Sequence, residues 1–168
     1  GKSFYFKVNG VPVFMKGANY IPGDILLPRV DTAKYIRVVR EAVDANMNML
    51  RVWGGAIYEN DIFYDLCDEN GILIWQDFMF ACALQPGDED HLENIRKEAE
   101  YNVKRLRNHP SIALWCGNNE ISEGWERWGW KDGLALPQSA KLDQAYRQLF
   151  KTILPDVVTS RSSVPYWE

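Results

Sequence analysis

The sequence predicts an α/β fold in which four parallel strands alternate with helices, after a β-hairpin at the start of the chain. Short, unbroken apolar runs recur at residues 72–75 and 112–116, and such runs are typical of strands that are buried on both faces. Longer segments between them repeat apolar residues at positions three and four apart, which is the spacing of an amphipathic helix. This alternation indicates parallel βα units.

The β-hairpin is predicted from Asn9-Gly10, which separates two apolar segments over residues 4–8 and 11–15. Asn-Gly is the strongest two-residue hairpin signal because both positions tolerate a positive φ. Pro12 lacks a backbone donor, so we expect an edge strand there. Residues 14–20 then lead into the first parallel strand, and residues 21–24 are predicted to be a loop.

The remaining elements have their own boundary signals. Asp31 is a candidate N-cap, Asn60 or Asp61 caps the second helix, and Gly71 ends it. Leu154-Pro155 is expected to end the last helix. The predicted strands cover 49–53, 72–75 and 112–116, and the predicted helices cover about 31–46, 60–70, 89–108 and 138–153. Charged residues alternate along the helix at 89–108, so we expect a solvent-facing outer side.

Such βα units occur in α/β barrels and in doubly wound sheets. Trp53-Gly54-Gly55 is the segment most like a glycine-rich phosphate-binding loop, but it has neither the G-x-G-x-x-G nor the G-x-x-x-x-G-K-[ST] pattern. The barrel is therefore favoured over a nucleotide-binding sheet. A complete TIM (β/α)8 barrel has eight units and takes about 250 residues. We therefore predict that residues 1–168 are one domain, the N-terminal half of a barrel in a larger multidomain protein.

Composition excludes several kinds of partner. The formal net charge of -4 argues against nucleic acid and anionic membranes, and no apolar run approaches the roughly 20 residues of a membrane span. Cys67, Cys82 and Cys116 are odd in number without C-x-x-C spacing, so we expect buried free thiols. His91 and His109 are too few and too scattered for a metal cluster, and we expect neither a metal nor another cofactor.

Polar side chains follow the predicted strands at the edge where a barrel builds its active site. Glu120 directly follows a buried strand and lies beside an amide, which favours a catalytic carboxylate over a solvated loop residue. Arg51 and Asp77 could instead form a structural ion pair, and Trp53 could be a core residue. The full set of candidates is Asn19, Arg51, Trp53, Gln76, Asp77, Asn119 and Glu120.

Tryptophans are frequent, at seven in the chain, and indole rings bind the C–H faces of sugars or simply fill cores. Trp125, Trp128 and Trp130 cannot all face a ligand, so we expect one or two of them to hold their loop down. Glu123 and Glu126 are expected to face solvent.

Three segments resemble the catalytic domain of glycoside hydrolase family 2. They are Arg51-Val-Trp-Gly-Gly, Phe63-Tyr-Asp-Leu-Cys-Asp-Glu-Asn-Gly-Ile-Leu-Ile-Trp-Gln-Asp-Phe-Met-Phe and Asn108-His-Pro-Ser-Ile-Ala-Leu-Trp-Cys-Gly-Asn-Asn-Glu. Asn-His-Pro-Ser and the final Asn-Glu are typical of the wider family. Trp-Cys-Gly-Asn-Asn-Glu and Trp-Gln-Asp-Phe-Met-Phe resemble its β-mannosidases, and the similarity extends over nearly the whole chain.

The resemblance implies a retaining exo-glycosidase that hydrolyses terminal β-linked sugars, with β-D-mannosides preferred. Glu120 matches the acid/base residue, which protonates the leaving oxygen and then activates water. We expect it to be buried near Trp115 or the loop tryptophans. Asn119 matches an amide that contacts the sugar, and Arg51 matches an arginine beside the nucleophile. Trp53 and Trp128 match aromatic residues that line the sugar site, and Asp77 matches a residue of the pocket.

Retaining hydrolysis needs a second carboxylate about 5 to 5.5 Å from the first. In the family it lies near the end of the seventh strand, beyond residue 168. We therefore expect these residues alone to be inactive, to need the remainder of the parent chain, and to self-associate through an open sheet edge. The alternatives are another family 2 activity (exo-β-glucosaminidase, β-galactosidase or β-glucuronidase) and a non-catalytic carbohydrate-binding module.

Overall fold

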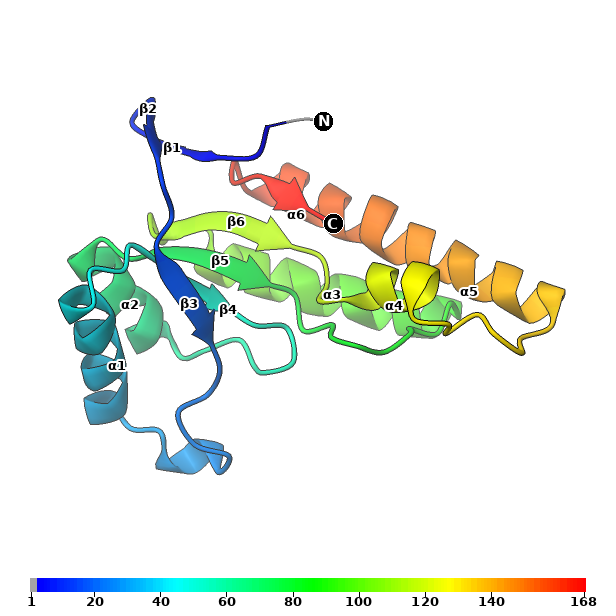
Figure 1. The fold of residues 1–168 in the computed structure, drawn as a ribbon, viewed down its shortest axis with the longest axis horizontal. Coiled ribbons are helices and arrows are strands. Elements are labelled where there is room, and N and C mark those ends of the chain that lie inside the picture. The colour runs from blue at the N-terminus through cyan, green and yellow to red at the C-terminus, as the bar shows by residue number, and fades with distance from the viewer. Residues whose placement is uncertain (1–2) are drawn as a thin grey trace.

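The computed structural model describes residues 3–168, so residues 1 and 2 of the predicted domain lie outside it. Its centre is a five-stranded, fully parallel sheet with helices packed against one face, which confirms the α/β class (Figure 1). The strands stand in sequence order: β3 (Gly17–Tyr20), β4 (Met49–Val52), β5 (Leu73–Asp77), β6 (Ile112–Cys116) and β7 (Tyr166–Trp167). Because neighbours in the sheet are neighbours along the chain, strand order does not reverse within the described residues.

The predicted hairpin is confirmed. Strands β1 (Phe6–Val8) and β2 (Val11–Val13) pair antiparallel, with Lys7 opposite Pro12. Asn9 and Gly10 have φ of 51° and 80°, the positive values that a tight two-residue turn requires. The segment before the hairpin crosses the sheet, where the Phe4 ring lies 5.9 Å from Trp75 and 4.7 Å from Trp167.

The first three predicted helices are confirmed, and so are the end signals at Asp31 and Gly71, whereas Asn60 precedes the second helix without a capping hydrogen bond from its side chain. The three helices are α1 (Thr32–Asp44), α2 (Asp61–Asn70) and α3 (Glu89–Leu106). The Asp31 side chain accepts a hydrogen bond from the backbone N–H of Lys34 at 2.9 Å, and therefore caps α1. Gly71 ends α2 in the left-handed conformation, with φ 67°. On α3, Arg96 and Lys97 pair with Glu93, and these three side chains are between 38% and 70% exposed, as expected for a solvated face.

The prediction that Leu154-Pro155 ends the last helix is wrong. Helix α5 (Leu136–Gln148) continues through a π turn (Leu149–Ile153) into α6 (Leu154–Arg161). In the π turn the N–H of Leu154 bonds to the carbonyl of Leu149, five residues back. Pro155 follows in the first turn of α6 and has no N–H to give to the carbonyl of Phe150, five residues back. The Tyr166 hydroxyl donates to that carbonyl instead, at 2.7 Å, and the chain stays helical.

The tryptophan-rich loop after β6 also differs from the prediction, because it begins with a short helix, α4 (Ile121–Arg127). The Asn118 side chain accepts a hydrogen bond from the backbone N–H of Ile121 at 3.1 Å and stabilises the start of this helix. A 3₁₀ turn, η1 (Leu27–Arg29), lies in the loop after β3.

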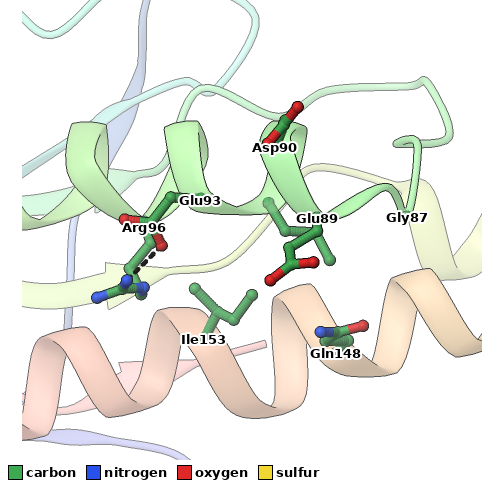
Figure 2. Close-up of a pocket in the computed structure, with 8 residues that line it drawn as sticks. Gly87, Glu89, Asp90, Glu93, Arg96, Gln148 and Ile153 are labelled. Carbon is green, nitrogen blue, oxygen red and sulfur yellow. Dashed lines mark hydrogen bonds and ion pairs between the residues drawn. The ribbon is translucent and has the colours of Figure 1, made fainter.

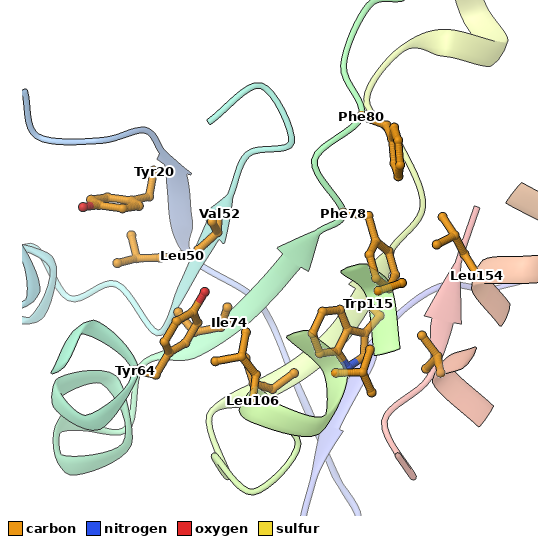
Figure 3. Packing of buried hydrophobic residues seen from close by; sticks show 14 of the residues in the cluster. Tyr20, Leu50, Val52, Tyr64, Ile74, Phe78, Phe80, Leu106, Trp115 and Leu154 are labelled. Atoms are coloured by element: carbon orange, nitrogen blue, oxygen red, sulfur yellow. The ribbon is translucent and has the colours of Figure 1, made fainter. Parts of the chain in front are cut away.

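The core lies between the sheet and the helices (Figure 3). Trp115 of β6 is fully buried there, and its ring stacks on Phe78 with centroids 5.1 Å apart. Cys67 and Cys116 are buried free thiols, and burial raises the pKa of each to about 12. Cys82 is exposed, so the expectation of burial is wrong for this thiol. No helix in residues 3–168 has the length and apolar character to cross a membrane.

The histidine at the Asn-His-Pro-Ser segment ties β6 to α2. His109 Nδ1 lies 2.7 Å from Asp68 Oδ2, and Asp68 Oδ1 accepts the backbone N–H of Ser111 at 2.9 Å. Asp65 approaches the same ring at 3.8 Å. These partners satisfy Asp68 from within the chain and fix the entry to β6.

Candidate active site

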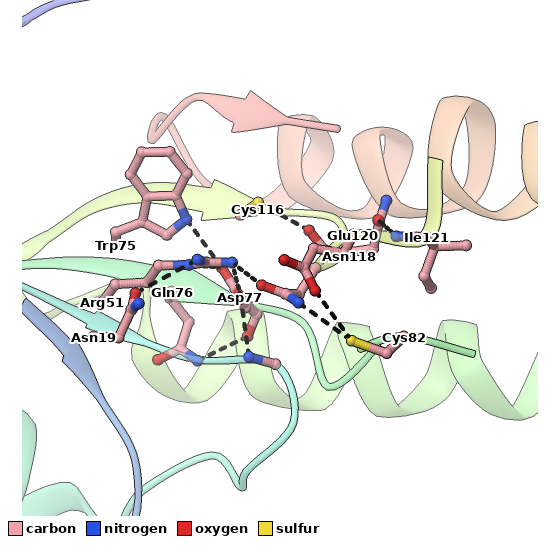
Figure 4. Close-up of polar contacts among 12 residues, drawn as sticks. Asn19, Arg51, Trp75, Gln76, Asp77, Cys82, Cys116, Asn118, Glu120 and Ile121 are labelled. Atoms are coloured by element: carbon pink, nitrogen blue, oxygen red, sulfur yellow. Dashed lines mark hydrogen bonds and ion pairs between the residues drawn. The ribbon is translucent and has the colours of Figure 1, made fainter. Parts of the chain in front are cut away.

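The polar candidates meet at the C-terminal ends of the parallel strands (Figure 4). Asn19 pairs in register with Arg51 across β3 and β4, and Asp77 ends β5 opposite Cys116 of β6. Asn119 follows β6 after a two-residue turn. Parallel strands bring their carboxyl ends to one edge, so Asn19 and Asn119, 100 positions apart, both approach the Arg51 guanidinium.

Asp77 is the most buried member of the cluster, with a side chain that is 0% exposed. Its Oδ1 accepts from Arg51 Nε at 3.2 Å and from Trp75 Nε1 at 2.9 Å. Its Oδ2 accepts from Arg51 Nη2 at 2.7 Å and from the backbone N–H of Gly54 at 3.0 Å. Burial raises the pKa of Asp77, while the guanidinium and the other donors oppose this shift.

Arg51 links this carboxylate to the amides of the site. The same Nη2 nitrogen that contacts Asp77 donates to Asn119 Oδ1 at 2.9 Å, and Nη1 lies 3.5 Å from Asn19 Oδ1. The guanidinium stands 5.7 Å from the ring centroid of Trp75. The structural ion pair between Arg51 and Asp77, expected as an alternative role for Arg51, is therefore present, and the same guanidinium also holds the Asn119 amide.

Gln76 does not join the cluster. Its Oε1 accepts from the Tyr64 hydroxyl at 2.7 Å, and its Nε2 donates to the carbonyl of Asp77 at 2.8 Å. Tyr64 belongs to α2, so the Gln76 side chain faces the helices. Successive residues on a strand point to opposite faces, which separates Gln76 from Asp77.

Glu120 differs from the expectation of burial, because it is exposed in the turn that opens α4. Its backbone is left-handed, with φ 62°, which is uncommon for a residue other than glycine. Trp115, one of its expected neighbours, lies in the core on the helix-covered face of the sheet. One oxygen of Glu120, Oε2, lies 3.4 Å from the Cys82 thiol sulfur.

Cys82 was not identified from the sequence as a site residue. It lies in the loop after β5, 38 positions before Glu120, and no motif marks it. The one sequence feature that could have indicated Cys82 is its position in the loop that follows the strand ending at Asp77.

The tryptophans divide as expected between packing and exposure. Trp125 is buried, with 3% of its surface exposed, whereas Trp128 is 51% exposed. Trp130 packs on Gly124, where a Cβ would lie 2.5 Å from its ring. Glu123 and Glu126 pair with Arg127 and Lys131, respectively.

Trp53 stands directly after β4 at the same sheet edge as Arg51. Its ring lies against Gly55, where a Cβ would be 2.0 Å from the indole, so this contact requires glycine. Trp53 also lines a cavity of about 430 Å³ together with Ile21 and Ile57. Within the described chain, no hydrogen bond joins Trp53 or Trp128 to the Arg51 cluster.

Other cavities help to locate the site. Asn19 and Arg51 line a cavity of about 340 Å³ beside Met49 and Gly17. A larger cavity, of about 590 Å³, lies between α3 on one side and the continuous helix formed by α5 and the π turn on the other (Figure 2). It is lined by Glu93, Arg96, Gln148, Ile153 and neighbours, and none of the predicted site residues contributes to it. This cavity therefore lies in the helical layer, apart from the candidate residues at the strand ends.

Comparisons with known proteins find relatives for nearly the whole chain, although it matches no protein-family model. The beta-mannosidase of Bos taurus is 56% identical over 132 residues, covering 79% of this chain and 15% of that protein. Beta-mannosidase B of Aspergillus fumigatus is 46% identical over 169 residues, covering 96% of this chain and 20% of that protein.

Solved structures agree with these matches. The crystal structure of beta-D-mannosidase from Dictyoglomus thermophilum superposes with a TM-score of 0.89 at 50% identity, over 99% of this chain and 20% of that one. A beta-glucuronidase of Parabacteroides merdae matches with a TM-score of 0.69 at 19% identity, which is evidence of a shared fold alone. The chain spans between 15% and 20% of the length of these four proteins.

Proposed function

Since this chain belongs with the β-mannosidases in glycoside hydrolase family 2, we propose that it supplies one half of the active site of a retaining exo-β-mannosidase. Identities of 45% to 58% to several beta-mannosidases support a β-glycosidase. The observation that carries the proposal is an exposed carboxylate, Glu120, at the end of β6 beside an amide that Arg51 holds in place.

The fold proposed for the parent protein is a (β/α)8 barrel, of which residues 1–168 form the N-terminal half. The parallel sheet in sequential order supports this, because a barrel has no point at which strand order reverses. The polar cluster lies at the C-terminal strand ends, where barrel enzymes build their sites. The much greater length of the relatives fits a domain that continues past β7.

In the proposed mechanism Glu120 is the acid/base residue. Protonated, it gives its proton to the glycosidic oxygen while a nucleophile attacks the anomeric carbon and the leaving group departs. As a carboxylate it then takes a proton from the water that hydrolyses the glycosyl-enzyme. Asn119 contacts the sugar beside Glu120, and Arg51 stands near the nucleophile. The nucleophile itself is a carboxylate in the part of the parent protein beyond residue 168.

Asp77 takes part through Arg51 in this proposal. Its oxygens are occupied by donors from Arg51, Trp75 and Gly54 and have no access to solvent, so a sugar hydroxyl has no free acceptor there. The buried carboxylate instead holds the guanidinium, and the guanidinium orients Asn119. Trp53 and Trp128 supply the aromatic surfaces of the sugar site.

Two alternatives remain as outcomes of the test. Another family 2 activity would keep Glu120 and the strand-end cluster but differ in the sugar. A carbohydrate-binding module would use the exposed Trp128 and would need no nucleophile.

Glu120→Gln in the full-length parent protein tests the proposal. We expect hydrolysis of methyl β-mannoside to fall by about 10²- to 10⁴-fold, because the leaving group needs a proton. Sugar binding should persist, and Glu123→Gln is a matched control in the next turn. Hydrolysis by Glu120→Gln at the wild-type rate would refute the proposal. A preference of the parent protein for another β-glycoside would instead indicate another family 2 activity. The 168-residue chain alone should show no turnover and should self-associate.

A further inference from the structure

The loop after β5 is held against the turn that carries Glu120. The backbone N–H of Asn119 donates to the carbonyl of Phe80 at 2.8 Å, and the N–H of Cys82 donates to the carbonyl of Asn119 at 3.0 Å. Ala81 and Asn119 thereby form a parallel β-bridge. The Phe80 ring is buried against Phe150, with centroids 5.5 Å apart. The loop is therefore placed by backbone pairing and a core anchor, and the Cys82 side chain with it.

The thiol of Cys82 stands between two side chains of the site. Its sulfur lies 3.4 Å from Glu120 Oε2 and 3.5 Å from Asn119 Nδ2 (Figure 4). A carboxylate only accepts hydrogen bonds, so the S–H donates to Glu120 while the sulfur accepts from the amide. Contacts therefore run without interruption from Asp77 through Arg51, Asn119 and Cys82 to Glu120.

Both ends of the thiol–carboxylate contact have left-handed backbones. Cys82 has φ 53° and Glu120 has φ 62°. Glycine is the residue that adopts this region without strain, and strained residues with side chains cluster at functional sites. Here the two left-handed residues lie in different loops, and their side chains meet at the 3.4 Å contact.

We propose that Cys82 is a positioning residue for Glu120, whose thiol fixes the carboxylate so that the second oxygen points at the leaving group. The inference rests on the proposed acid/base role of Glu120. The thiol holds Oε2, and no hydrogen bond within residues 3–168 involves Oε1. Oε1 is thus the oxygen left to carry the proton. Fixing an acid within reach of its target contributes to rate because misplacement is costly.

Cys82→Ala and Cys82→Ser in the full-length protein test this proposal. Alanine has the same left-handed backbone penalty as cysteine, so it removes the thiol alone, while a serine hydroxyl still donates. Each variant is assayed on 2,4-dinitrophenyl β-mannoside, whose leaving group needs little protonation, and on methyl β-mannoside, which needs the acid. Ala83→Ser is the control in the same exposed loop, and circular dichroism monitors folding.

The expected result is a fall of about fivefold to tenfold in kcat/KM for methyl β-mannoside in Cys82→Ala, the size of one hydrogen bond, with little change for the activated substrate. Cys82→Ser should retain most of the rate, because the serine hydroxyl still donates to the carboxylate. Equal losses on both substrates would indicate a sugar contact and overturn the proposal, as would no loss at all.

Glu120→Gln in the same series distinguishes a failure of the positioning role of Cys82 from a failure of the proposed function. If Glu120→Gln abolishes hydrolysis of the methyl glycoside while Cys82→Ala leaves it unchanged, only the positioning role fails. If Glu120→Gln is itself active on that substrate, the proposed function fails and the positioning role with it.

Discussion

Asp77→Asn measures how much the buried carboxylate contributes to the stability of the strand ends. The substitution keeps the shape of the side chain but replaces one carboxylate oxygen with an amide nitrogen. Four donor contacts from three residues converge on Asp77: two from Arg51, one from Trp75 and one from the backbone of Gly54. Whichever way the amide turns, its NH₂ group faces two of those donors.

The cost follows from the donors that lose their acceptor. A buried donor without a partner costs about 1 to 3 kcal/mol, and two are left here. The Arg51 side chain is 25% exposed, so water compensates part of its loss. We expect about 3 kcal/mol, at the lower end of the range for breaking a buried ion pair. This corresponds to roughly a 150-fold change in the folding equilibrium.

Urea unfolding of the 168-residue chain, followed by tryptophan fluorescence and circular dichroism, measures this difference. With a slope of about 2 kcal/mol/M, the midpoint should fall by about 1.5 M. Asp143→Asn is the matched control, because Asp143 pairs with Arg147 at the same 2.7 Å but on the surface of α5. That control should change the midpoint little, since water screens exposed pairs. Equal shifts in the two variants would refute the argument from burial.

Two further predictions concern Trp53 and Glu59. Gly55→Ala places a Cβ 2.0 Å from the Trp53 indole, so the ring must move, and we expect turnover by the parent protein to fall about tenfold. Gly23 lies in open space, so Gly23→Ala is the control and should leave the rate unchanged. Equal rates for the two variants would contradict this prediction. Burial raises the pKa of Glu59, whose Oε2 accepts the Tyr35 hydroxyl at 2.6 Å. Its contribution to stability is therefore present below the ordinary pKa of 4.5 and is lost as pH rises through the raised value. The unfolding midpoint of Glu59→Gln should therefore fall less than that of the wild type as pH rises above 4.5, and parallel curves for the two proteins would contradict this.

Local signals predicted most of the fold. Asn9-Gly10, Asp31 and Gly71 each act through their own backbone conformation or a contact a few residues away, and each lies where expected. The order of strands and helices followed from apolar periodicity, which reflects burial on one face or on both. Pro155 was misjudged because its effect depends on its place in a turn, and the π turn before it shifts the hydrogen bonds.

At the site, the sequence alone determined which residues end the strands, and therefore that Arg51, Asp77 and Asn119 would meet at one edge. The tertiary structure decided which way their side chains point. Gln76 turned to the helices because residues alternate along a strand, and Asp77 became a buried partner of Arg51.

Only the tertiary structure brought Cys82 to Glu120, across 38 positions of sequence. The contact arises from a β-bridge between two loops and from two left-handed residues, and neither has a local sequence signal. Strand ends can be placed from sequence because hydrogen-bonded ladders set them in register. The contacts between the loops that follow depend on how those loops pack in the folded chain.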